Sequence, residues 1–557
     1  MNHVLASIVM DPHAAAELAD EGDILVHYQT PLIEGKDVYL EVKGGTYTPS
    51  DPNTGIVDWN TETWSEAKYT WQNGSLQHQW TYNSDWKPVP GPWSTGVTYR
   101  SSVGPSWEPL FHAALTDDAL YIPAAGGTVL KVNKSDGTLI SRINPFGTSI
   151  DQNIFLVSPI SADASGNIYY TTLKFNGDPT DPDPNQRTFV WTMDVAGAWL
   201  VKITSAGNAS KVSFNMIAAG AVAANSQCET SFSYPGEGVS LPVNPDTDVA
   251  QTITCGSQRP ALNSAPAIAP NGVIYLVSRA QFADRYGYLV AVNPNFTQKW
   301  IASFRNRFHD GCNVILPPNG TPGGCTSGTT TGFDPSTNNW PAGRVNEDSS
   351  ASPTIAPDGS IFYGTHTRYN WSQGHLVHFS SNGTFLNFYG NFGWDTTPGI
   401  FKHASTYSII MKENYYEDPG SYCNDSTACP RDRGAVYPDN PPRYFLSSFS
   451  PNLVKEWGWQ NTNTFSCSRD SSSGDVTCVS DHPYGFEWCV NAVAIDKTGH
   501  VFAGSEDGNL YEVKNGELVE KLFLDLSLGA AYTPTGIDSD GRIYGQNFGT
   551  LKVVGNK

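Results

Sequence analysis

Short runs of alternating apolar and polar residues, separated by tight Gly-containing turns, recur along most of the chain. In Val493–Val513 (VAIDKTGHVFAGSEDGNLYEV), a short apolar segment meets the turn D-K-T-G, and two further strand-like runs follow. A period of two is typical of β-strands, and Asp/Asn-Gly turns between such runs are typical of hairpins. The pattern predicts antiparallel strands almost throughout, with one helix candidate at Pro12–Ala19.

This pattern repeats about eight times. Each copy continues into a third strand, another tight turn such as Ser-Asn-Gly, and an outer strand that often ends in an aromatic residue. One copy runs into the next without a linker, which argues against a string of separate sandwiches. We therefore predict an all-β fold, a single closed β-propeller of about eight four-stranded antiparallel blades, with seven blades as the alternative. The copies begin at Ser158, Ala265, Ser352, Val493 and Thr533, with a looser copy at Phe111 and degenerate ones after Gln29 and Phe401.

The last copy, Thr533–Val554, is followed only by Gly555–Lys557 and so lacks an outer strand. A closed ring leaves no sheet edge free. We therefore expect an N-terminal segment within Asp23–Tyr28 (DILVHY) to complete this blade. The predicted domains are an N-terminal extension at 1–22 and a single propeller at 23–557.

The long insertions share one position in the repeat. In a propeller, the loop between the second and third strands and the connection between blades lie on the same face. All the long insertions are of these two kinds, so they should gather over one mouth of the central channel, and long ordered loops are usually functional. They are Lys174–Gly197, His366–Gly374, Lys412–Pro442, Asn215–Leu262, Asn306–Asp348 and Asn463–Phe486.

Eight of the nine cysteines lie near one another in pairs inside these insertions. A crosslink reduces the entropy of such Gly-, Ser- and Asp-rich loops in the unfolded chain. Zinc is the alternative, but CxxC and paired histidines are missing. Disulfides predict a secreted or periplasmic protein, whereas the eight N-x-S/T sequons, Asn73 and Asn370 among them, are near chance in number. The predicted disulfides are Cys228–Cys255, Cys312–Cys325, Cys423–Cys429 and Cys467–Cys478, with Cys489 left as a buried free thiol.

Composition narrows the class of partner. The chain of 557 residues has 54 acidic residues against 33 Lys plus Arg, a net charge of −21. Nucleic-acid binding needs clustered basic residues, so we expect no nucleic-acid partner. The longest apolar stretch, around Met216–Ala224, is far shorter than the ~20 residues of a membrane-spanning helix. We therefore expect no membrane span.

The repeats resemble those of a known family. Asp496–Val513 (DKTGHVFAGSEDGNLYEV) and the segment APDGSIFYGTH are similar to the repeats of quinoprotein-like, PQQ-like propellers. That family includes the PQQ alcohol dehydrogenases and non-catalytic relatives such as BamB. The resemblance covers Phe111–Val554 and implies the propeller fold, with quinone-dependent dehydrogenation or scaffolding as activities. The chain has no clean AxDxxTGxxxW repeat, no vicinal cysteines and no CxxCH.

The first residues of each inner strand should ring the channel mouth on the loop-rich face. His112 and His403 fall at equivalent offsets in their repeats, and imidazoles beside carboxylates can act as acid and base. Arginines and aromatic residues in the insertions suit a sugar or another amphiphilic ligand. The alternative is that the aromatic residues only pack the loops against each other and that the histidines form hydrogen bonds to neighbouring blades. The candidate catalytic residues are His112, His403, Glu487 and Tyr532, and the candidate ligand-binding residues are Arg305, Arg344, Glu347, Asp348, Trp371, Trp394 and Asn491.

We expect a secreted propeller that binds an extracellular small molecule or polysaccharide at this channel mouth. An enzymatic form of this hypothesis is a polysaccharide lyase or hydrolase. The alternatives are a non-catalytic scaffold and a PQQ-dependent dehydrogenase. The sequence assigns no metal, no cofactor and no oligomeric state.

Overall fold

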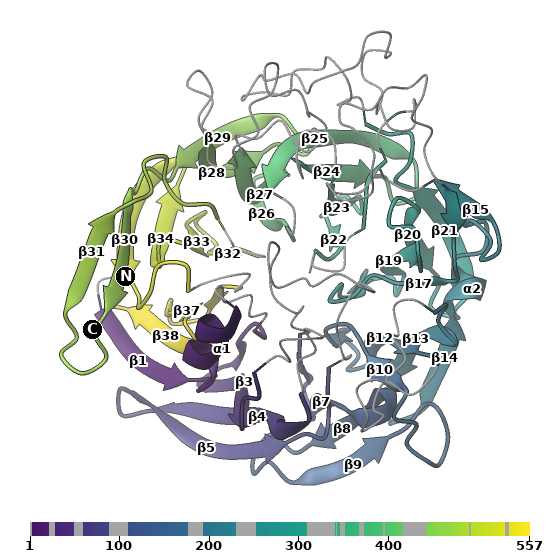
Figure 1. Ribbon diagram of the computed structural model, residues 1–557, viewed down its shortest axis with the longest axis horizontal. Helices are drawn as coiled ribbons and strands as arrows, with labels where there is room; N and C mark the ends of the chain where they lie inside the picture. Colours follow the sequence, from purple (N-terminus) through teal and green to yellow (C-terminus); the bar gives the residue numbers. More distant parts are fainter. Residues whose placement is uncertain are drawn as a thin grey trace.

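Eight antiparallel sheets surround a central axis and form a closed ring, as Figure 1 shows in a view down the shortest axis of the molecule. The prediction of an all-β propeller with eight blades is confirmed, and the seven-blade alternative is excluded. The computed structural model describes residues 3–21, 28–49, 59–88, 110–176, 193–229, 252–308, 340, 342–345, 351–366, 373–393, 396–415, 442–488, 492–529 and 534–556.

Blades 1 to 4 follow the chain from Leu32 to Ser303, and in blades 3 and 4 the inner strand is split in two. Blade 1 contains β2 (Leu32–Glu34), β3 (Asp37–Gly45), β4 (Glu62–Gln72) and β5 (Ser75–Asn83), with the 3-10 turn η1 (Trp59–Thr61) before β4. Blade 2 contains β6 (Ala114–Leu115), β7 (Leu120–Ala124), η3 (Ala125–Gly127), β8 (Thr128–Val132) and β9 (Leu139–Ile143). Blade 3 contains β10 (Ile154–Leu156), β11 (Ser161–Ala162), β12 (Ile168–Lys174), β13 (Gly197–Ile203) and β14 (Ala209–Ser213). Blade 4 contains β17 (Gln258–Pro260), β18 (Ala267–Ile268), β19 (Ile274–Ala280), β20 (Gly287–Val292) and β21 (Gln298–Ser303).

Blades 5 to 8 complete the ring. Blade 5 contains β22 (Thr354–Ile355), β23 (Ile361–His366), β24 (Gln373–Phe379) and β25 (Phe385–Gly393). Blade 6 contains β26 (Gly399–His403), β27 (Thr406–Tyr415), β28 (Arg443–Phe449) and β29 (Lys455–Gln460). Blade 7 contains β32 (Ala494–Ile495), β33 (Val501–Gly504), β34 (Asn509–Lys514) and β35 (Glu517–Phe523). Blade 8 contains β36 (Gly536–Ile537), β37 (Ile543–Asn547), β38 (Thr550–Gly555) and β1 (His3–Val9).

An N-terminal strand supplies the outer strand of blade 8. β1 pairs antiparallel with β38, from His3 opposite Gly555 to Val9 opposite Thr550. The sequence pointed instead to Asp23–Tyr28 and treated residues 1–22 as an extension. The alternating sequence of β1 (HVLASIV) is typical of a strand and suits the open edge of β38. The helix α1 (Ala14–Glu21) follows β1 and lies close to the helix expected at Pro12–Ala19.

Tryptophans of outer strands dock onto turns of the next blade. The Trp80 indole of blade 1 donates to the Lys134 carbonyl at 3.2 Å, and Trp300 of blade 4 donates to Ser381 at 3.0 Å. A Cβ on Gly137 or Gly383 would stand 2.7 Å from these rings, and both glycines have positive φ. These two turns therefore need glycine for conformation and for close approach.

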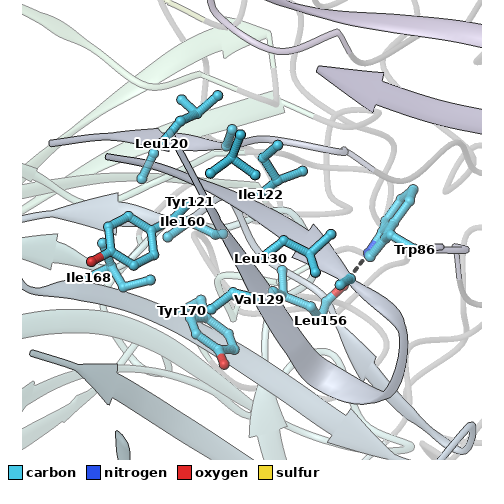
Figure 2. Packing of buried hydrophobic residues seen from close by; sticks show 14 of the residues in the cluster. Trp86, Leu120, Tyr121, Ile122, Val129, Leu130, Leu156, Ile160, Ile168 and Tyr170 are labelled. Carbon is cyan, nitrogen blue, oxygen red and sulfur yellow. Dashed lines mark hydrogen bonds between the residues drawn. The ribbon is translucent and has the colours of Figure 1, made fainter. Parts of the chain in front are cut away.

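Each blade buries its apolar faces against its neighbours. Between blades 2 and 3 the side chains of Leu120, Ile122 and Tyr170 are fully buried, together with Trp86, whose indole donates to the Leu156 carbonyl at 3.4 Å (Figure 2). A fully buried side chain of this size stabilises the fold by about 1.5–3 kcal/mol. Interlocking blades thus form a core that runs around the ring.

The insertions connect the elements that the topology requires. Lys174–Gly197 joins the end of β12 to the start of β13. Lys412–Pro442 leads from β27 to β28, but its first four residues still belong to β27, so this insertion starts later than predicted. Asn215–Leu262 and Asn463–Phe486 connect successive blades. We call the end of the ring where second strands stop and third strands start the loop-bearing end, and the opposite end the short-turn end.

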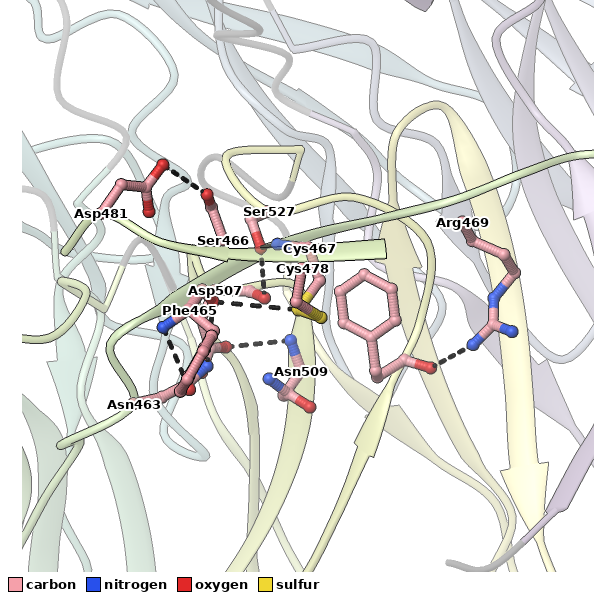
Figure 3. The surroundings of a disulfide bond; sticks show 11 residues. Asn463, Phe465, Ser466, Cys467, Arg469, Cys478, Asp481, Asp507, Asn509 and Ser527 are labelled. Atoms are coloured by element: carbon pink, nitrogen blue, oxygen red, sulfur yellow. Dashed lines mark hydrogen bonds between the residues drawn. A yellow bond between two sulfur atoms is a disulfide. The ribbon is translucent and has the colours of Figure 1, made fainter. Parts of the chain in front are cut away.

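Two of the predicted disulfides lie in the described residues and are confirmed. Cys228–Cys255, with Cα atoms 5.1 Å apart, joins β15 (Gln227–Glu229) to β16 (Thr252–Thr254), after the short helix α2 (Phe214–Ile217). Cys467–Cys478, 4.1 Å apart, joins β30 (Phe465–Arg469) to β31 (Val476–Ser480) (Figure 3). The other predicted cysteines, Cys312, Cys325, Cys423, Cys429 and Cys489, lie outside the described residues.

Candidate functional site

Segments that lead into the inner strands at the loop-bearing end are hydrogen-bonded from blade to blade. Ala113 N donates to the Gln29 side chain at 2.8 Å, and Ile160 N donates to the His112 carbonyl at 3.2 Å. Asn263 N donates to Val157 at 2.9 Å. These polar groups therefore hold the ring together. Further links are Ala265–Ser352, Ser352–Thr397, Ala492–Thr535 and Gln29–Gln546.

His112 lies in this inner ring. Its Nδ1 is 2.8 Å from the carbonyl oxygen of Ala113. Burial lowers the pKa of the imidazole to about 4, so the ring is neutral at neutral pH. This environment fits the alternative given above, in which the histidine links neighbouring blades and has no chemical role.

His403 lies at the other end of the ring from His112. It is the last residue of β26, opposite Thr406 across the turn into β27, and its Nε2 is 2.8 Å from Ser408 Oγ. The prediction that His403 stands at the channel mouth is wrong, because the copy at Phe401 begins near the end of its inner strand. β26 pairs from Gly399 onward.

The predicted catalytic residues do not come together. Glu487 precedes β32 at the loop-bearing end, and its carbonyl accepts from Ser505 Oγ at 3.2 Å. His403 lies at the short-turn end, and Tyr532 lies outside the described residues. Among the residues that the structure describes, no group of three or more His, Cys, Asp or Glu could hold a metal ion. Of the ligand-binding candidates, Glu347, Asp348, Trp371, Trp394 and Asn491 also lie outside the described residues.

Arg305 follows the outer strand of blade 4 at the loop-bearing end. Its guanidinium bonds Glu229 at 2.7 Å and lies 4.1 Å from the centre of the Tyr286 ring. Glu229 belongs to β15, whose Cys228 is fully buried. Arg305 thus fastens the disulfide-linked hairpin β15–β16 onto blade 4.

Arg344 belongs to a group of arginines around Asp284, in the loop between β19 and β20. Its Nε donates to Asp284 Oδ2 at 2.7 Å. Burial alone would raise the pKa of this carboxyl, but the charges of Arg344 and Arg279, with Arg285 adding to them, hold it well below its usual range. We call Asp284, Arg279, Arg285 and Arg344 the arginine cluster.

The arginine cluster is tightly built. Arg279 donates to the Val345 carbonyl at 2.8 Å and to the Ala280 carbonyl at 3.0 Å. Val345 N donates to the Asp284 carbonyl at 3.0 Å. Within the described residues of this cluster, three guanidinium groups act on one carboxylate.

The sequence pattern predicted Arg344 as a site residue but did not indicate Asp284 and Arg279. The available indication was the pair Asp284-Arg285 in the apolar run of blade 4, at a second-to-third-strand loop. That loop is short, so it is not one of the long insertions from which the candidate residues were predicted. Arg279 on β19 lies opposite Arg259 on β17. This pairing exists because the inner strand of blade 4 is split in two, which the sequence does not show.

A second charged group, of opposite sign, occupies the same end of blade 1. Lys43 Nζ is 2.6 Å from Glu17, 3.1 Å from Asp11 and 3.3 Å from Glu62, and all four side chains are buried. We call these residues the carboxylate cluster.

Glu66 is also buried on β4, four residues after Glu62. Burial raises the pKa of Glu66 to about 8, although a hydrogen bond from Gln29 opposes the rise. Glu17 and Glu62 also have raised pKa values because they are buried, in spite of Lys43. Blade 1 thus carries an excess of carboxyl groups where blade 4 carries an excess of arginines.

Comparison with known proteins yields similarities of fold alone. No family model and no curated protein sequence matches the chain. Among solved structures, a europium-containing methanol dehydrogenase aligns with TM-score 0.44 and 8% identity over 97% of this chain and 84% of that one. Quinohemoprotein alcohol dehydrogenase from Comamonas testosteroni aligns with TM-score 0.43 and 11% identity, over 98% and 77%. BamB from Moraxella catarrhalis aligns with TM-score 0.36 and 10% identity, over 92% and 97%. These are PQQ-like propellers, as the repeats indicated.

The described part of the chain contains no helix that is long and apolar enough to cross a membrane.

Proposed function

We propose that the protein is an exported propeller that binds an extracellular polysaccharide with carboxylate groups at its loop-bearing end, at blade 4. The arginine cluster is the observation that carries this proposal. A chain with a net charge of −21 repels polyanions in general, so an anionic chain would approach where the local charge is reversed. Export is supported by the two disulfides, which persist in oxidising compartments.

Arginine suits this ligand class for geometric reasons. The planar guanidinium can bind a carboxylate through two parallel hydrogen bonds. Arg344 and Arg305 remain 15% and 20% exposed, and Tyr286 offers a flat ring beside Arg305. Arg279 and Arg285 are buried and supply the field rather than the contact.

Binding without chemistry is the activity that the geometry supports best. His112, His403 and Glu487 are separated among blades and ends of the ring, so no acid–base pair forms from them. For the quinone-dependent alternative, the chain offers no vicinal cysteines, and the described inner-ring groups are engaged between blades. We derive no step through a quinone.

The test is titration of the purified protein with polygalacturonate and with neutral dextran of similar length. We expect binding of polygalacturonate that weakens with added salt, and no binding of dextran. Arg344→Gln should weaken binding about tenfold, the effect of losing about 1.4 kcal/mol of a charge-assisted bond. Arg142→Gln on blade 2, which breaks the ion pair of Arg142 with Asp85, is the matched control. Equal binding of both polymers, or of neither, would contradict the proposal.

A further inference from the structure

Asparagine occurs in every turn between a third and a fourth strand. These turns lie at the short-turn end, on the outer rim of blades 1 to 7. In blades 1 to 5, but not in blades 6 and 7, a Ser or Thr follows two residues later. The asparagines are Asn73, Asn133, Asn208, Asn295, Asn382, Asn452 and Asn515, and the hydroxyl residues are Ser75, Ser135, Ser210, Thr297 and Thr384.

Five sequons therefore lie in the turn between the third and fourth strands of five consecutive blades, although the asparagine stands at different positions within the turn. The other three, at Asn319, Asn370 and Asn424, lie outside the described residues. The total of eight sequons is near chance for this composition. Their distribution in the fold, with five in equivalent turns, needs a separate explanation.

The conformation of the turn accounts for the asparagine but not for the hydroxyl. Blade 4 has N-P-N-F-T and blade 6 has S-P-N-L-V in the same five-residue turn. Phe296 and Leu453 have φ of 69° and 59°, and each donates its N–H to the first residue of its turn at 2.8 Å. Thr297 and Val454 thus close equivalent turns, so a hydroxyl is not needed there.

The two-residue turns of blades 1 and 7 also need the asparagine but not the hydroxyl residue. Asn73 and Asn515 have φ of 51° and 50°, and each is followed by a glycine with positive φ. Left-handed Asn-Gly is favoured in such hairpin turns. Ser75 follows in blade 1 and Glu517 in blade 7. The hydroxyl at this position is therefore independent of the turn type.

The asparagine amides have the geometry of acceptors. In Asn295 the Oδ1 accepts from the N–H and the hydroxyl of Thr297, at 3.2 and 2.7 Å. In Asn133 it accepts the same two groups from Ser135, both at 2.9 Å, and Asn382 accepts from Thr384. In these three asparagines the Oδ1 is thus engaged, and all five asparagines are half-exposed or exposed.

We propose that Asn73, Asn133, Asn208, Asn295 and Asn382 are N-glycosylation sites, which place a belt of carbohydrate on the short-turn rim of blades 1 to 5. In the reaction, a bond forms between Nδ2 and the anomeric carbon of a lipid-linked oligosaccharide. The bond from that carbon to the lipid pyrophosphate breaks, and the amide proton leaves to base. No redox step is involved, and the acceptor sequence is the one that such transfer recognises.

The outer strands show what the carbohydrate does. β5, β9, β14, β21 and β25 contain at most one Lys, Arg, Asp or Glu each, whereas β29 contains two and β35 three. Leu139 and Ile140 on β9 and Leu386 on β25 are about half exposed; Leu518 and Val519 on β35 are as well, but there they lie among three charged residues. An open apolar strand edge promotes association, and charge is one common protection. Glycans supply that protection on blades 1 to 5, and they leave the loop-bearing end free.

The first experiment maps occupancy in the protein purified from its natural source. Enzymatic release of N-glycans in H₂¹⁸O converts each occupied asparagine to ¹⁸O-labelled aspartate, which mass spectrometry of peptides locates. We expect label at the five asparagines and none at Asn452 and Asn515. Unlabelled asparagine at all five positions would overturn the proposal.

A matched pair of variants tests the turn itself. Thr297→Val should abolish glycosylation at Asn295, and Val454→Thr should create it at Asn452, both with unchanged melting temperature because each turn tolerates either residue. A V454T protein that is secreted from the same cells without modification would contradict the assignment of this turn as an acceptor. Polyanion binding should be unchanged in both variants, so failure here is distinguishable from failure of the proposed function.

Discussion

The carboxylate cluster of blade 1 and the arginine cluster of blade 4 are built from similar parts at the same end of the ring. In blade 1, one ammonium group is surrounded by three carboxyl groups, and burial raises the pKa of Glu17 and Glu62. In blade 4, one carboxylate faces three guanidinium groups, and its pKa is held low. Burial acts to raise the carboxyl pKa in both clusters. The charges around each carboxyl group therefore decide whether its pKa ends above or below the usual value.

This difference polarises the loop-bearing end. Under the proposed function, an anionic ligand would approach blade 4 rather than blade 1, although both belong to one acidic protein. The comparison also separates two roles. Lys43 links the segment after β1 to β3, and so fastens the ring closure, whereas Arg344 lies partly exposed in a connection between blades.

The largest effect is expected from removing the cation of blade 1. Lys43→Met leaves Asp11, Glu17 and Glu62 buried without a counter-charge, which should cost about 3–5 kcal/mol at pH 7. The loss should shrink at pH 5, because the carboxyl groups can then take up protons. Denaturant unfolding at both pH values measures it. Lys134→Met, which breaks a pair with the half-exposed Glu34, should cost less than about 1 kcal/mol; equal losses would show that burial is not decisive.

Asp284→Asn tests the opposite arrangement. The folded-state pKa of Asp284 is depressed, so its stabilisation is present above the ordinary carboxyl pKa and is lost only in strong acid. The variant should lose about 3 kcal/mol, to a similar extent at pH 5 and pH 8. It should also bind polygalacturonate more tightly than the wild type does. A loss that appears only near pH 8 would contradict the assigned charge environment.

Glu66→Gln should have the opposite sign, a gain in stability that grows with pH. Because burial raises the folded-state pKa from 4.5 to about 8, the folded state holds this proton more tightly than the unfolded state does. The favourable contribution is complete below pH 4.5 and is lost as pH rises to 8, at about 1.4 kcal/mol per pH unit at most.

The variant should therefore gain stability over the wild type between pH 5 and pH 8, as thermal unfolding across that range will show. Glu34→Gln, at an exposed carboxylate of the same blade, should retain the wild-type slope. If E66Q and the wild type kept a constant difference across the range, Glu66 would not titrate there.

The sequence predicted the ring and the distribution of its loops because both follow from local patterns. The turns, the period of two and the neighbouring cysteines such as Cys467 and Cys478 are visible in short windows. Short windows do not show that β1 closes the ring instead of Asp23–Tyr28. Only the pairing of β1 with β38 identifies the closing strand.

The candidate site was less predictable, because it depends on contacts between distant segments. Arg344 meets Asp284 sixty residues earlier, and Arg305 meets Glu229 on the β15–β16 hairpin. A histidine such as His403 can be assigned to the wrong end of the ring by an error of a few residues in where an inner strand starts. Charge pairing of this kind needs the three-dimensional register.

Hydrogen exchange with and without polygalacturonate tests the central claim most directly. Peptides covering 279–286 and 342–345, around the arginine cluster, should become more protected when the polymer binds. Peptides covering 38–45 and 59–66, around the carboxylate cluster, should exchange at unchanged rates. Protection at blade 1, or protection confined to the short-turn end, would contradict the account.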